Sequence, residues 1–342
     1  MKRPNILWYC TDQQRFDTIA SLGNPHIHTP VLDRLVERGV AFTRAYTQSP
    51  ICTPSRASFL TGRYPAAHHV HRNGNEYFPA SERLVTKTLA DAGYDCALAG
   101  KLHLSRAKER VERRPDDGYR LFHWSHHPAP DWGEGHAYES WLTTECGVDP
   151  TELYASYRDK PYGVPEEYHQ TTWCTEMAMR FIDEPRDAPW MLSLNPFDPH
   201  PPFDAPETYL NRYEKHSLPL PIFGPRDVEH QRKYSEIDQQ SRVSIDPANA
   251  ANPQVAEEDD PNRDRASDPP KSYDPQLVKA SYYGMIELID TQLGRLLDHI
   301  DAKGELDNTI VIFCSDHGEL LGDHGLLLKG CRFFEGLVHV PL

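Results

Sequence analysis

Acidic, amide and imidazole side chains follow two strand-like segments at opposite ends of the chain. Asp12 and Gln13 come directly after the apolar run NILWYC, and Asp316 and His317 follow the β-branched run NTIVIFCS. In an open α/β sheet the ligand crevice lies beyond the carboxyl ends of the strands, so both groups can meet there. Such an oxygen-rich set suits Ca²⁺, Mg²⁺ or Mn²⁺. We predict a divalent metal site; the alternative is that Asp12 caps a turn and His317 is an ordinary loop residue.

A cysteine at position 52 lies between Pro50 and Pro54, four residues before Arg56. In phosphatases with a thiolate nucleophile the arginine comes later in the loop, so that mechanism does not fit. The two prolines keep the backbone extended up to the start of a predicted helix, where anions are favoured. Cys52 is therefore a candidate active-site residue, and a buried structural cysteine is the alternative.

Strand-like and helical segments alternate along the chain. The predicted strands cover 5–10, 95–100, 190–195 and a segment that begins at 308; the predicted helices cover 29–39 with Thr29 as N-cap, a segment from about 55, 82–92 and 276–303. This alternation predicts an α/β domain over residues 1–342, with a large, mostly parallel sheet between layers of helices.

One internal segment differs in composition. Residues 225–275 are rich in Pro, Asp and Asn and contain few large apolar side chains, which predicts a polar surface insert without a catalytic role. The chain stops in an apolar, strand-like stretch, HVPL. We expect from this that a C-terminal part of the fold is missing from the chain.

The charge of the chain disfavours nucleic acids and anionic membranes as partners. Its 36 Lys and Arg residues and 51 Asp and Glu residues give a formal net charge of −15, which repels both. The seven cysteines show no CxxC spacing, which favours a reducing compartment over a disulfide framework or a structural zinc site. The apolar run near the N-terminus is too short for a signal peptide or a membrane span, so we expect a cytoplasmic location.

The segment CTPSRASFLTGR at 52–63 resembles the C-x-P-S-R-x4-T-G-R motif of the type I sulfatases, which are members of the alkaline phosphatase superfamily. PNILWYCTDQQRFD, GYDCALAGKLHL and SDHGELLGDHGLLLKG are similar to further family segments and follow the family's order. The resemblance implies an alkaline phosphatase-like fold, whose smaller C-terminal subdomain is absent here. It also implies an enzyme that hydrolyses sulfate monoesters to an alcohol and inorganic sulfate.

In that family a formylglycine-generating enzyme reads C-x-P-S-R and converts the cysteine to Cα-formylglycine. The resemblance therefore implies that Cys52 becomes formylglycine and that its hydrate is the nucleophile. One hydroxyl of the hydrate attacks sulfur and releases the alcohol, and the other is deprotonated so that the ester collapses and expels sulfate. The resemblance also implies one divalent metal ion. It favours Ca²⁺, with Mn²⁺ or Mg²⁺ as alternatives.

The resemblance assigns roles to individual residues of this chain. It assigns metal binding to Asp12, Gln13, residue 52, Asp316 and His317. It places Arg56, Lys101 and His103 around the nucleophile and the sulfate, and His200 and Lys329 beside the leaving group and the sulfate. It also assigns substrate binding to Asn73, with Asn75 as the alternative. We expect the HHVH run at 68–71 to be loop surface without metal ligands, and we do not expect Asp323 and His324 to bind metal. We expect Cys314, in a strand interior, to lack a partner.

Two positions depart from the pattern of many sulfatases, which have Asp at position 13 and Asn at position 317. Choline sulfatases and phosphonate monoester hydrolases are similar to this chain at both positions. The alternative activity is therefore hydrolysis of phosphonate monoesters or phosphodiesters, although Lys101 and His103 favour a sulfatase. An inactive binding relative with unmodified Cys52 is a further alternative.

The sequence leaves the substrate open among small-molecule and saccharide sulfate esters, and it leaves the oligomeric state open. The Tyr and Trp residues of segment 119–173 could stack on a sugar ring, or they could pack locally.

Overall fold

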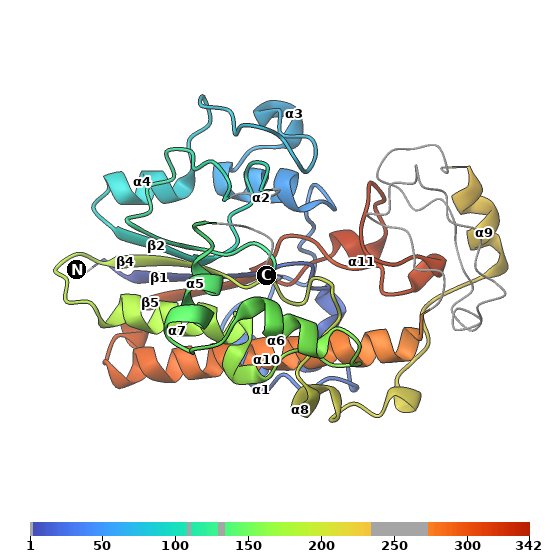
Figure 1. Cartoon of the computed structure of the whole chain (residues 1–342). Coiled ribbons are helices and arrows are strands. Elements are labelled where there is room, and N and C mark those ends of the chain that lie inside the picture. The colour runs from blue at the N-terminus through green and yellow to red at the C-terminus, as the bar shows by residue number, and fades with distance from the viewer. Residues whose placement is uncertain (1–2, 108–110, 129–133, 234–272) are drawn as a thin grey trace.

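A computed structural model of the chain describes residues 3–107, 111–128, 134–233 and 273–342. In these residues five strands form one sheet in the order β3-β2-β4-β1-β5. The strands are β1 Asn5–Thr11, β2 Asp95–Gly100, β3 Leu121–Trp124, β4 Trp190–Asn195 and β5 Thr309–Ser315. Each neighbouring pair is parallel. The carboxyl ends of all the strands therefore lie at one edge of the sheet (Figure 1).

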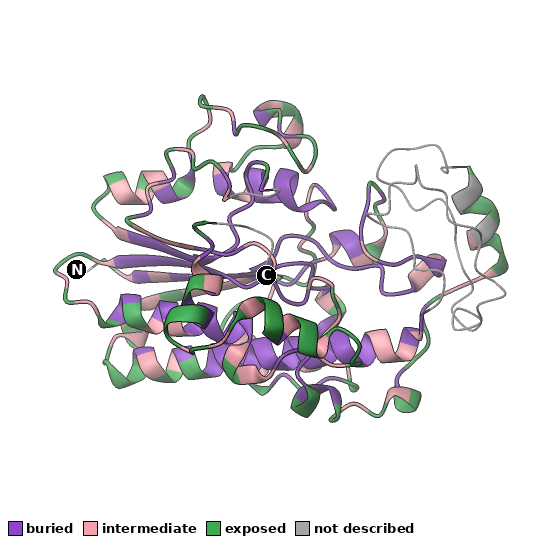
Figure 2. Cartoon of the chain, in the orientation of Figure 1, coloured by how far each residue is buried: buried purple, intermediate pink, exposed green. Residues whose placement is uncertain are grey.

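Helices cover both faces of the sheet (Figure 1). One layer contains α1 Pro30–Arg38, α7 Gln170–Asp183 and α10 Pro275–Ala302; the other contains α2 Cys52–Thr61 and α4 Val85–Asp91. Side chains of β1 alternate between the two layers, since Leu7 and Tyr9 pack in the first core and Ile6 and Trp8 pack against the second. The sheet and the inner sides of the helices are buried (Figure 2). This architecture confirms the predicted α/β class.

Shorter helices connect these elements. They are α3 Pro65–His68, α5 Ala137–Thr144, α6 Pro150–Tyr157, α8 Glu207–Leu210, α9 Pro225–Arg232 and α11 Glu335–Val338. Most of the predicted insert at 225–275 lies outside the described residues, and its described beginning is α9. Among the described helices, none is both long and apolar enough to cross a membrane.

The start of α1 differs from the sequence prediction. The Thr29 hydroxyl accepts a hydrogen bond from the Ala20 N–H at 2.9 Å and does not cap the helix. Instead, the N–H groups of Val31 and Leu32 donate to the buried carboxylate of Asp290 on α10, at 3.0 and 2.7 Å. A tertiary partner thus satisfies the helix start, because α10 packs beside α1.

The long helix α10 holds the segment that follows β1. Asp274 caps its start by accepting hydrogen bonds from the N–H groups of Gln276 and Leu277. Farther along, the Tyr282 hydroxyl accepts a hydrogen bond from the Arg15 N–H at 3.0 Å and donates one to the Gln13 carbonyl at 2.6 Å. The helix therefore positions the backbone just beyond Asp12.

Helix α2 enters the core with its N-terminus toward the carboxyl ends of the strands. It begins at Cys52, three residues earlier than the predicted start near 55, and residues 52–58 are all buried. It ends at Gly62, whose φ of 68° is the left-handed conformation that suits glycine at a helix end.

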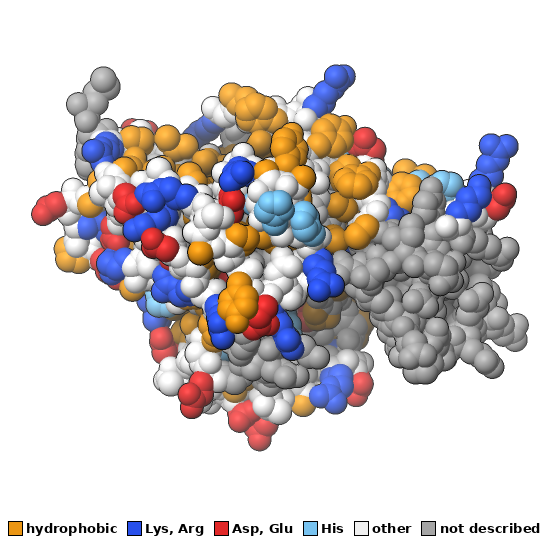
Figure 3. Space-filling model, turned by 90° about the horizontal axis from the view of Figure 1, so that it is seen from above, with side chains coloured by type: hydrophobic (Ala, Val, Ile, Leu, Met, Phe, Trp, Pro, Cys, Tyr) orange, Lys and Arg blue, Asp and Glu red, His pale blue; other side chains and the backbone are white. Residues whose placement is uncertain are grey.

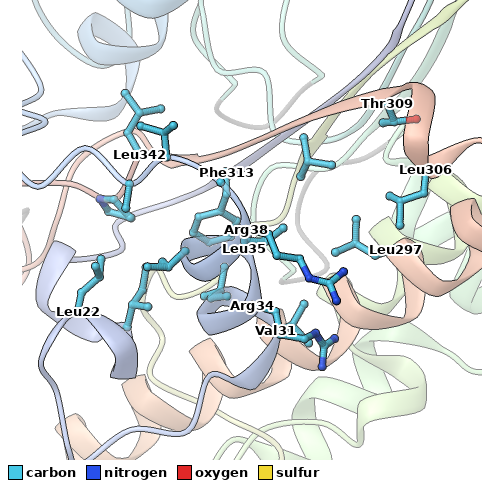
Figure 4. Close-up of a pocket in the computed structure, with 18 of the residues that line it drawn as sticks. Leu22, Val31, Arg34, Leu35, Arg38, Leu297, Leu306, Thr309, Phe313 and Leu342 are labelled. Carbon is cyan, nitrogen blue, oxygen red and sulfur yellow. The ribbon is translucent and has the colours of Figure 1, made fainter.

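A pocket of about 620 Å³ lies between α1, the end of α10 and β5. Figure 4 shows apolar side chains around it, among them Leu35, Leu297 and Phe313, with Leu342 at one side. None of the predicted site residues lines this pocket. It is therefore separate from the candidate site described below.

The face seen in Figure 3 is that of the layer containing α2 and α4. Acidic and basic side chains are interspersed on it, with apolar side chains and a small group of histidines between them. The described part of this face therefore carries no continuous field of one sign.

Candidate active site and metal centre

The ends of β1 and β5 bring two carboxylates together. The two strands are in register from Asn5 and Thr309 to Thr11 and Ser315, so the next residue of each strand, Asp12 and Asp316, leaves the sheet at the same point. Asp12, Asp316 and His317 are fully buried. The Gln13 N–H donates to the Asp316 Oδ1 at 3.0 Å, which joins the two segments directly.

The N-terminus of α2 adds the side chain of residue 52. The Cys52 Sγ lies 3.1 Å from the His317 Nε2 and 3.8 Å from the Asp12 Oδ1. One donor atom from each of Asp12, Cys52, Asp316 and His317 lies within 4.8 Å of the others. Two carboxylates and an imidazole beside residue 52 fit a divalent cation that takes oxygen and nitrogen ligands.

The imidazole of His317 is oriented by the backbone. Its Nδ1 lies 2.9 Å from the Gly318 carbonyl oxygen, so Nδ1 carries the proton and donates to that oxygen. The Nε2 then faces Cys52 and the carboxylates with its lone pair. A backbone carbonyl that fixes the tautomer in this way is a common support for a metal-binding histidine.

Two cations balance the carboxylates. The Arg56 Nε donates to the Asp316 Oδ2 at 2.9 Å, and its terminal nitrogen lies 3.5 Å from the Asp12 Oδ2. The Lys101 ammonium contacts the Asp12 carboxylate and lies 3.8 Å from the Cys52 Sγ. All these groups are buried, so each charge depends on its partner.

The cations decide the charge state at the centre. Burial alone would raise the pKa of Asp12, but the charges of Lys101 and Arg56 outweigh it and hold the pKa well below its usual value. Burial and Asp12 likewise oppose ionisation at Cys52, and the charges of Lys101 and Lys329 overcome them and lower its pKa. The centre therefore stabilises negative charge both on its ligands and at position 52.

A second group of residues is joined to the centre through the side chain of Gln13. The Lys329 Nζ lies 2.6 Å from the His200 Nε2 and donates to the Gln13 Oε1 at 2.5 Å. The His200 Nδ1 lies 2.7 Å from the Pro201 carbonyl oxygen. Burial, and next the charge of Lys329, hold the pKa of His200 well below its usual value. His200 is therefore neutral, and its Nε2 accepts a hydrogen bond from the Lys329 Nζ.

Comparison with known proteins identifies the family. The sequence of residues 4–342 matches the family model described as Sulfatase. The chain belongs to the sulfatase family. An arylsulfatase of Clostridium perfringens is 31% identical, in an alignment that covers 99% of this chain and 68% of the arylsulfatase. A choline-sulfatase of Rhizobium meliloti is 30% identical, in an alignment that covers 99% of this chain and 62% of the choline-sulfatase. The chain is thus similar to enzymes that are sulfuric ester hydrolases.

A solved structure of a phosphonate monoester hydrolase from Agrobacterium radiobacter has the same fold. The two structures superpose with a TM-score of 0.76 at 27% sequence identity. The superposed region covers 99% of this chain and 67% of the phosphonate monoester hydrolase. The chain spans about two thirds of the length of these sulfatase-family relatives. The similarity supports the predicted alkaline phosphatase-like architecture.

Gln13, a predicted sulfatase metal ligand, uses its side chain to support the site. Its amide oxygen accepts from Lys329, and its amide nitrogen contacts the buried carboxylate of Glu319. Its backbone has a φ of 74° and donates to Asp316. The described contacts of Gln13 therefore link the carboxylate cluster to Lys329, and its role as a ligand stays a prediction.

His103 and Asn73 also lie around the centre. The His103 N–H donates to the Glu112 Oε2 at 2.7 Å, and its ring meets the His126 ring edge-on at 4.4 Å. The Asn73 Oδ1 accepts from the Thr53 N–H at 2.9 Å, directly after residue 52. Asn75, the alternative to Asn73, accepts from the Arg106 N–H through its backbone carbonyl.

The histidine pattern at 68–71 and the Asp-His pair at 323–324 do not join the cluster. His68 is buried, contrary to the expectation of a surface run, because its ring bonds to the Ser58 hydroxyl at 2.9 Å. Asp323 pairs with Arg15 at 2.8 Å, and His324 lies 3.1 Å from Asp227. These pairs stabilise loops rather than bind the centre.

The aromatic residues of segment 119–173 pack locally. Trp141 and Trp173 belong to the core beside α7, Tyr119 packs in the core on the opposite face of the sheet, and Trp124 is buried near Ala107. Trp132 lies outside the described residues. The tryptophans placed by the structure are therefore unavailable to stack on a sugar.

Several supporting residues were not predicted. Asn195 donates to the Lys101 carbonyl at 2.9 Å, and its place at the carboxyl end of β4 could have indicated it. Phe197 packs below the Lys101 ammonium, 5.0 Å from its ring centroid. Cys314, expected to lack a partner, is in register with Cys10 across the β1–β5 pair and accepts from the Trp8 indole at 3.2 Å.

Proposed function

We propose that the chain hydrolyses sulfate monoesters, with Cys52 converted to formylglycine and its hydrate as the nucleophile. The observation that carries the proposal is the position of Cys52, whose Sγ lies among Asp12, Asp316, His317 and the Lys101 ammonium. The C-x-P-S-R segment of a sulfatase-family chain supports conversion by a formylglycine-generating enzyme. Without conversion, a thiol lacks the second hydroxyl that releases the bound sulfate.

The divalent cation would be held by Asp12, Gln13, Asp316, His317 and the modified residue 52. The family resemblance favours Ca²⁺, with Mn²⁺ and Mg²⁺ as alternatives. Such an ion supplies Lewis-acid stabilisation of sulfate oxygens and favours an ionised nucleophile. Arg56 donates to the Asp316 carboxylate and keeps it oriented. Lys101 contacts the Asp12 carboxylate, lowers its pKa and adds positive charge beside residue 52.

The leaving alcohol needs a proton as its bond to sulfur breaks. The Lys329 ammonium and the neutral His200 imidazole share a hydrogen bond at 2.6 Å, so this pair holds a proton at a defined place. We assign it to the leaving-group oxygen and to one sulfate oxygen. Asn73, anchored to the Thr53 N–H, is assigned to the same substrate surface.

A second candidate activity is hydrolysis of phosphonate monoesters. The similarity to the phosphonate monoester hydrolase of Agrobacterium radiobacter favours it, as does the Asp-Gln and Asp-His pattern of the centre. The buried Lys101 and His103 favour sulfate. Steady-state rates on an aryl sulfate and the matching aryl phosphonate decide between them: we expect a higher kcat/KM for the sulfate, and a higher value for the phosphonate would reverse the assignment.

Conversion of Cys52 is tested by peptide mass spectrometry of protein made together with a formylglycine-generating enzyme. We expect the peptide that contains residue 52 to lose the mass difference between a CH₂SH and a CHO group. Cys52→Ala, made in the same host, is the control for activity that does not depend on the modification. Fully unconverted Cys52 would favour an inactive binding relative.

A further inference from the structure

The carboxylate of Glu319 lies beside Gln13 and is fully buried. One of its oxygens, Oε2, contacts the Gln13 amide nitrogen. The other, Oε1, accepts a hydrogen bond from the Leu321 N–H at 3.0 Å and another from the Leu328 N–H. These three partners are all N–H donors, so Glu319 acts toward them as an acceptor at both oxygens. The sulfate chemistry above assigns no role to it.

The backbone of Glu319 is anchored without the help of its side chain. Its N–H donates to the Gly336 carbonyl at 3.0 Å, and its carbonyl oxygen accepts from the Arg15 guanidinium at 3.1 Å. The neighbouring Gly318 N–H donates to the Leu337 carbonyl at 2.8 Å. The carboxylate therefore has a fixed place, and a substitution of this side chain leaves these backbone bonds in position.

The two ends of the Gln13 amide meet groups of opposite kinds. An amide nitrogen can only donate hydrogen bonds, and an amide oxygen can only accept them. The nitrogen meets the Glu319 acceptor, whereas the oxygen accepts from the Lys329 ammonium at 2.5 Å. Lys329 is near enough to Asp12 and Cys52 for its charge to act on both. The amide oxygen thus meets the same positive charge that acts on the centre.

We propose that Glu319 is a positioning residue that fixes the orientation of the Gln13 amide, so that the oxygen is available to the centre and the nitrogen is turned away. This inference rests on the proposed function, in which Gln13 is one of the metal ligands. A hard cation binds an amide through its oxygen, and a flipped amide would present N–H donors to it instead. An aspartate at position 13 would not need this support, since both ends of a carboxylate are oxygens.

The test uses Glu319→Gln, which replaces two acceptor oxygens with one acceptor and one donor. The N–H groups of Leu321 and Leu328 require the acceptor, so the new amide nitrogen should face Gln13 and force its amide to flip. We expect the affinity for Mn²⁺ to fall about 10- to 100-fold, as for other residues that support metal ligands. Calorimetry on the converted, metal-free chain measures this affinity without a substrate.

Gln13→Glu, added to Glu319→Gln, exchanges the carboxylate and the amide between the two positions. The carboxylate at position 13 can accept from the new amide and still offer an oxygen to the metal, so most of the Mn²⁺ affinity should return. In the unchanged chain, Gln13→Glu places two carboxylates against each other and should raise the affinity by a much smaller factor. The difference between the two factors measures the coupling of the pair, and recovery in the double variant excludes misfolding as the cause of the loss.

Glu287→Gln is the matched control for the loss of a buried carboxylate. Glu287 lies on α10, and its partners Arg212 and His28 do not belong to the candidate site. This variant should keep the Mn²⁺ affinity of the unchanged chain.

Two results would overturn the inference while the sulfatase function stands: an unchanged Mn²⁺ affinity in Glu319→Gln, or an equal effect of Gln13→Glu in both backgrounds. The expected affinities in a converted chain that hydrolyses no sulfate ester would support the positioning role and overturn the proposed function. Absence of Mn²⁺ binding to the unchanged chain would overturn both.

Discussion

The Cys52 Sγ and the His317 Nε2 lie 3.1 Å apart, although 265 positions separate the two residues. The contact joins the N-terminus of α2 to the carboxyl end of β5, and Asp12 at the end of β1 completes the group. Three elements thus place one candidate nucleophile position beside three candidate ligand side chains. The account of the site depends on this convergence.

Removal of one carboxylate should abolish metal binding. Asp12→Asn removes a negative donor and leaves Lys101 without its buried counter-charge, whereas Arg56 keeps its ion pair with Asp316. We expect a fall of more than about 100-fold in metal affinity and in kcat/KM, since even residues that only support ligands contribute about 10- to 100-fold. Metal titration by calorimetry and aryl sulfate kinetics measure both.

Asp323→Asn is the control for that experiment, because Asp323 belongs to the other Asp-His pair and bonds to Arg15. It should lower stability slightly and leave metal affinity intact. If both variants lost metal equally, Asp12 would not be a specific ligand.

His200→Gln should affect substrates according to their leaving groups. In the proposed mechanism the hydrogen-bonded Lys329 and His200 pair supplies a proton to the leaving alkoxide, and a weakly acidic alcohol needs that proton more than 4-nitrophenol does. We expect kcat to fall about 100-fold for an alkyl or sugar sulfate and much less for 4-nitrophenyl sulfate. Equal losses on both substrates would assign His200 to another role.

Stability should fall as pH rises from the acid range toward neutrality because of Asp198. Burial raises the pKa of its carboxyl to about 7, and the hydrogen bond from the Thr171 hydroxyl at 2.8 Å offsets this only in part. A carboxyl whose folded pKa lies above the unfolded one stabilises the fold at low pH, and this contribution is lost as pH rises from about 4 to about 7.

Asp198→Asn removes that dependence and keeps an acceptor for Thr171. Urea unfolding at pH 5 and pH 8 should show the variant gaining about 2 kcal/mol relative to the unchanged chain at the higher pH. An identical difference at both pH values would mean that Asp198 is ionised in the fold throughout this range.

The position of the centre could be predicted from sequence because it follows from general properties of parallel sheets. Polar residues directly after two buried strands meet at one edge, and β1 and β5 proved to be neighbours in register. The helix after residue 52 was also predictable from its prolines. The family motifs then related the same residues to sulfatases.

Tertiary contacts account for what could not be predicted. Asp290 replaces Thr29 at the start of α1, since no local pattern specifies a helix 258 positions away. Phe197 and His126 come from loops whose meeting depends on the order of β3, β2 and β4 in the sheet. Their contacts become visible only when the strands are placed side by side.

The most direct test is anomalous diffraction from crystals of the converted chain soaked with Mn²⁺. We predict one anomalous peak bonded to side chains of Asp12, Asp316 and His317 and adjacent to residue 52. A peak elsewhere with none at these residues, or no peak at saturating Mn²⁺, would contradict a metal centre formed by the strand ends and α2.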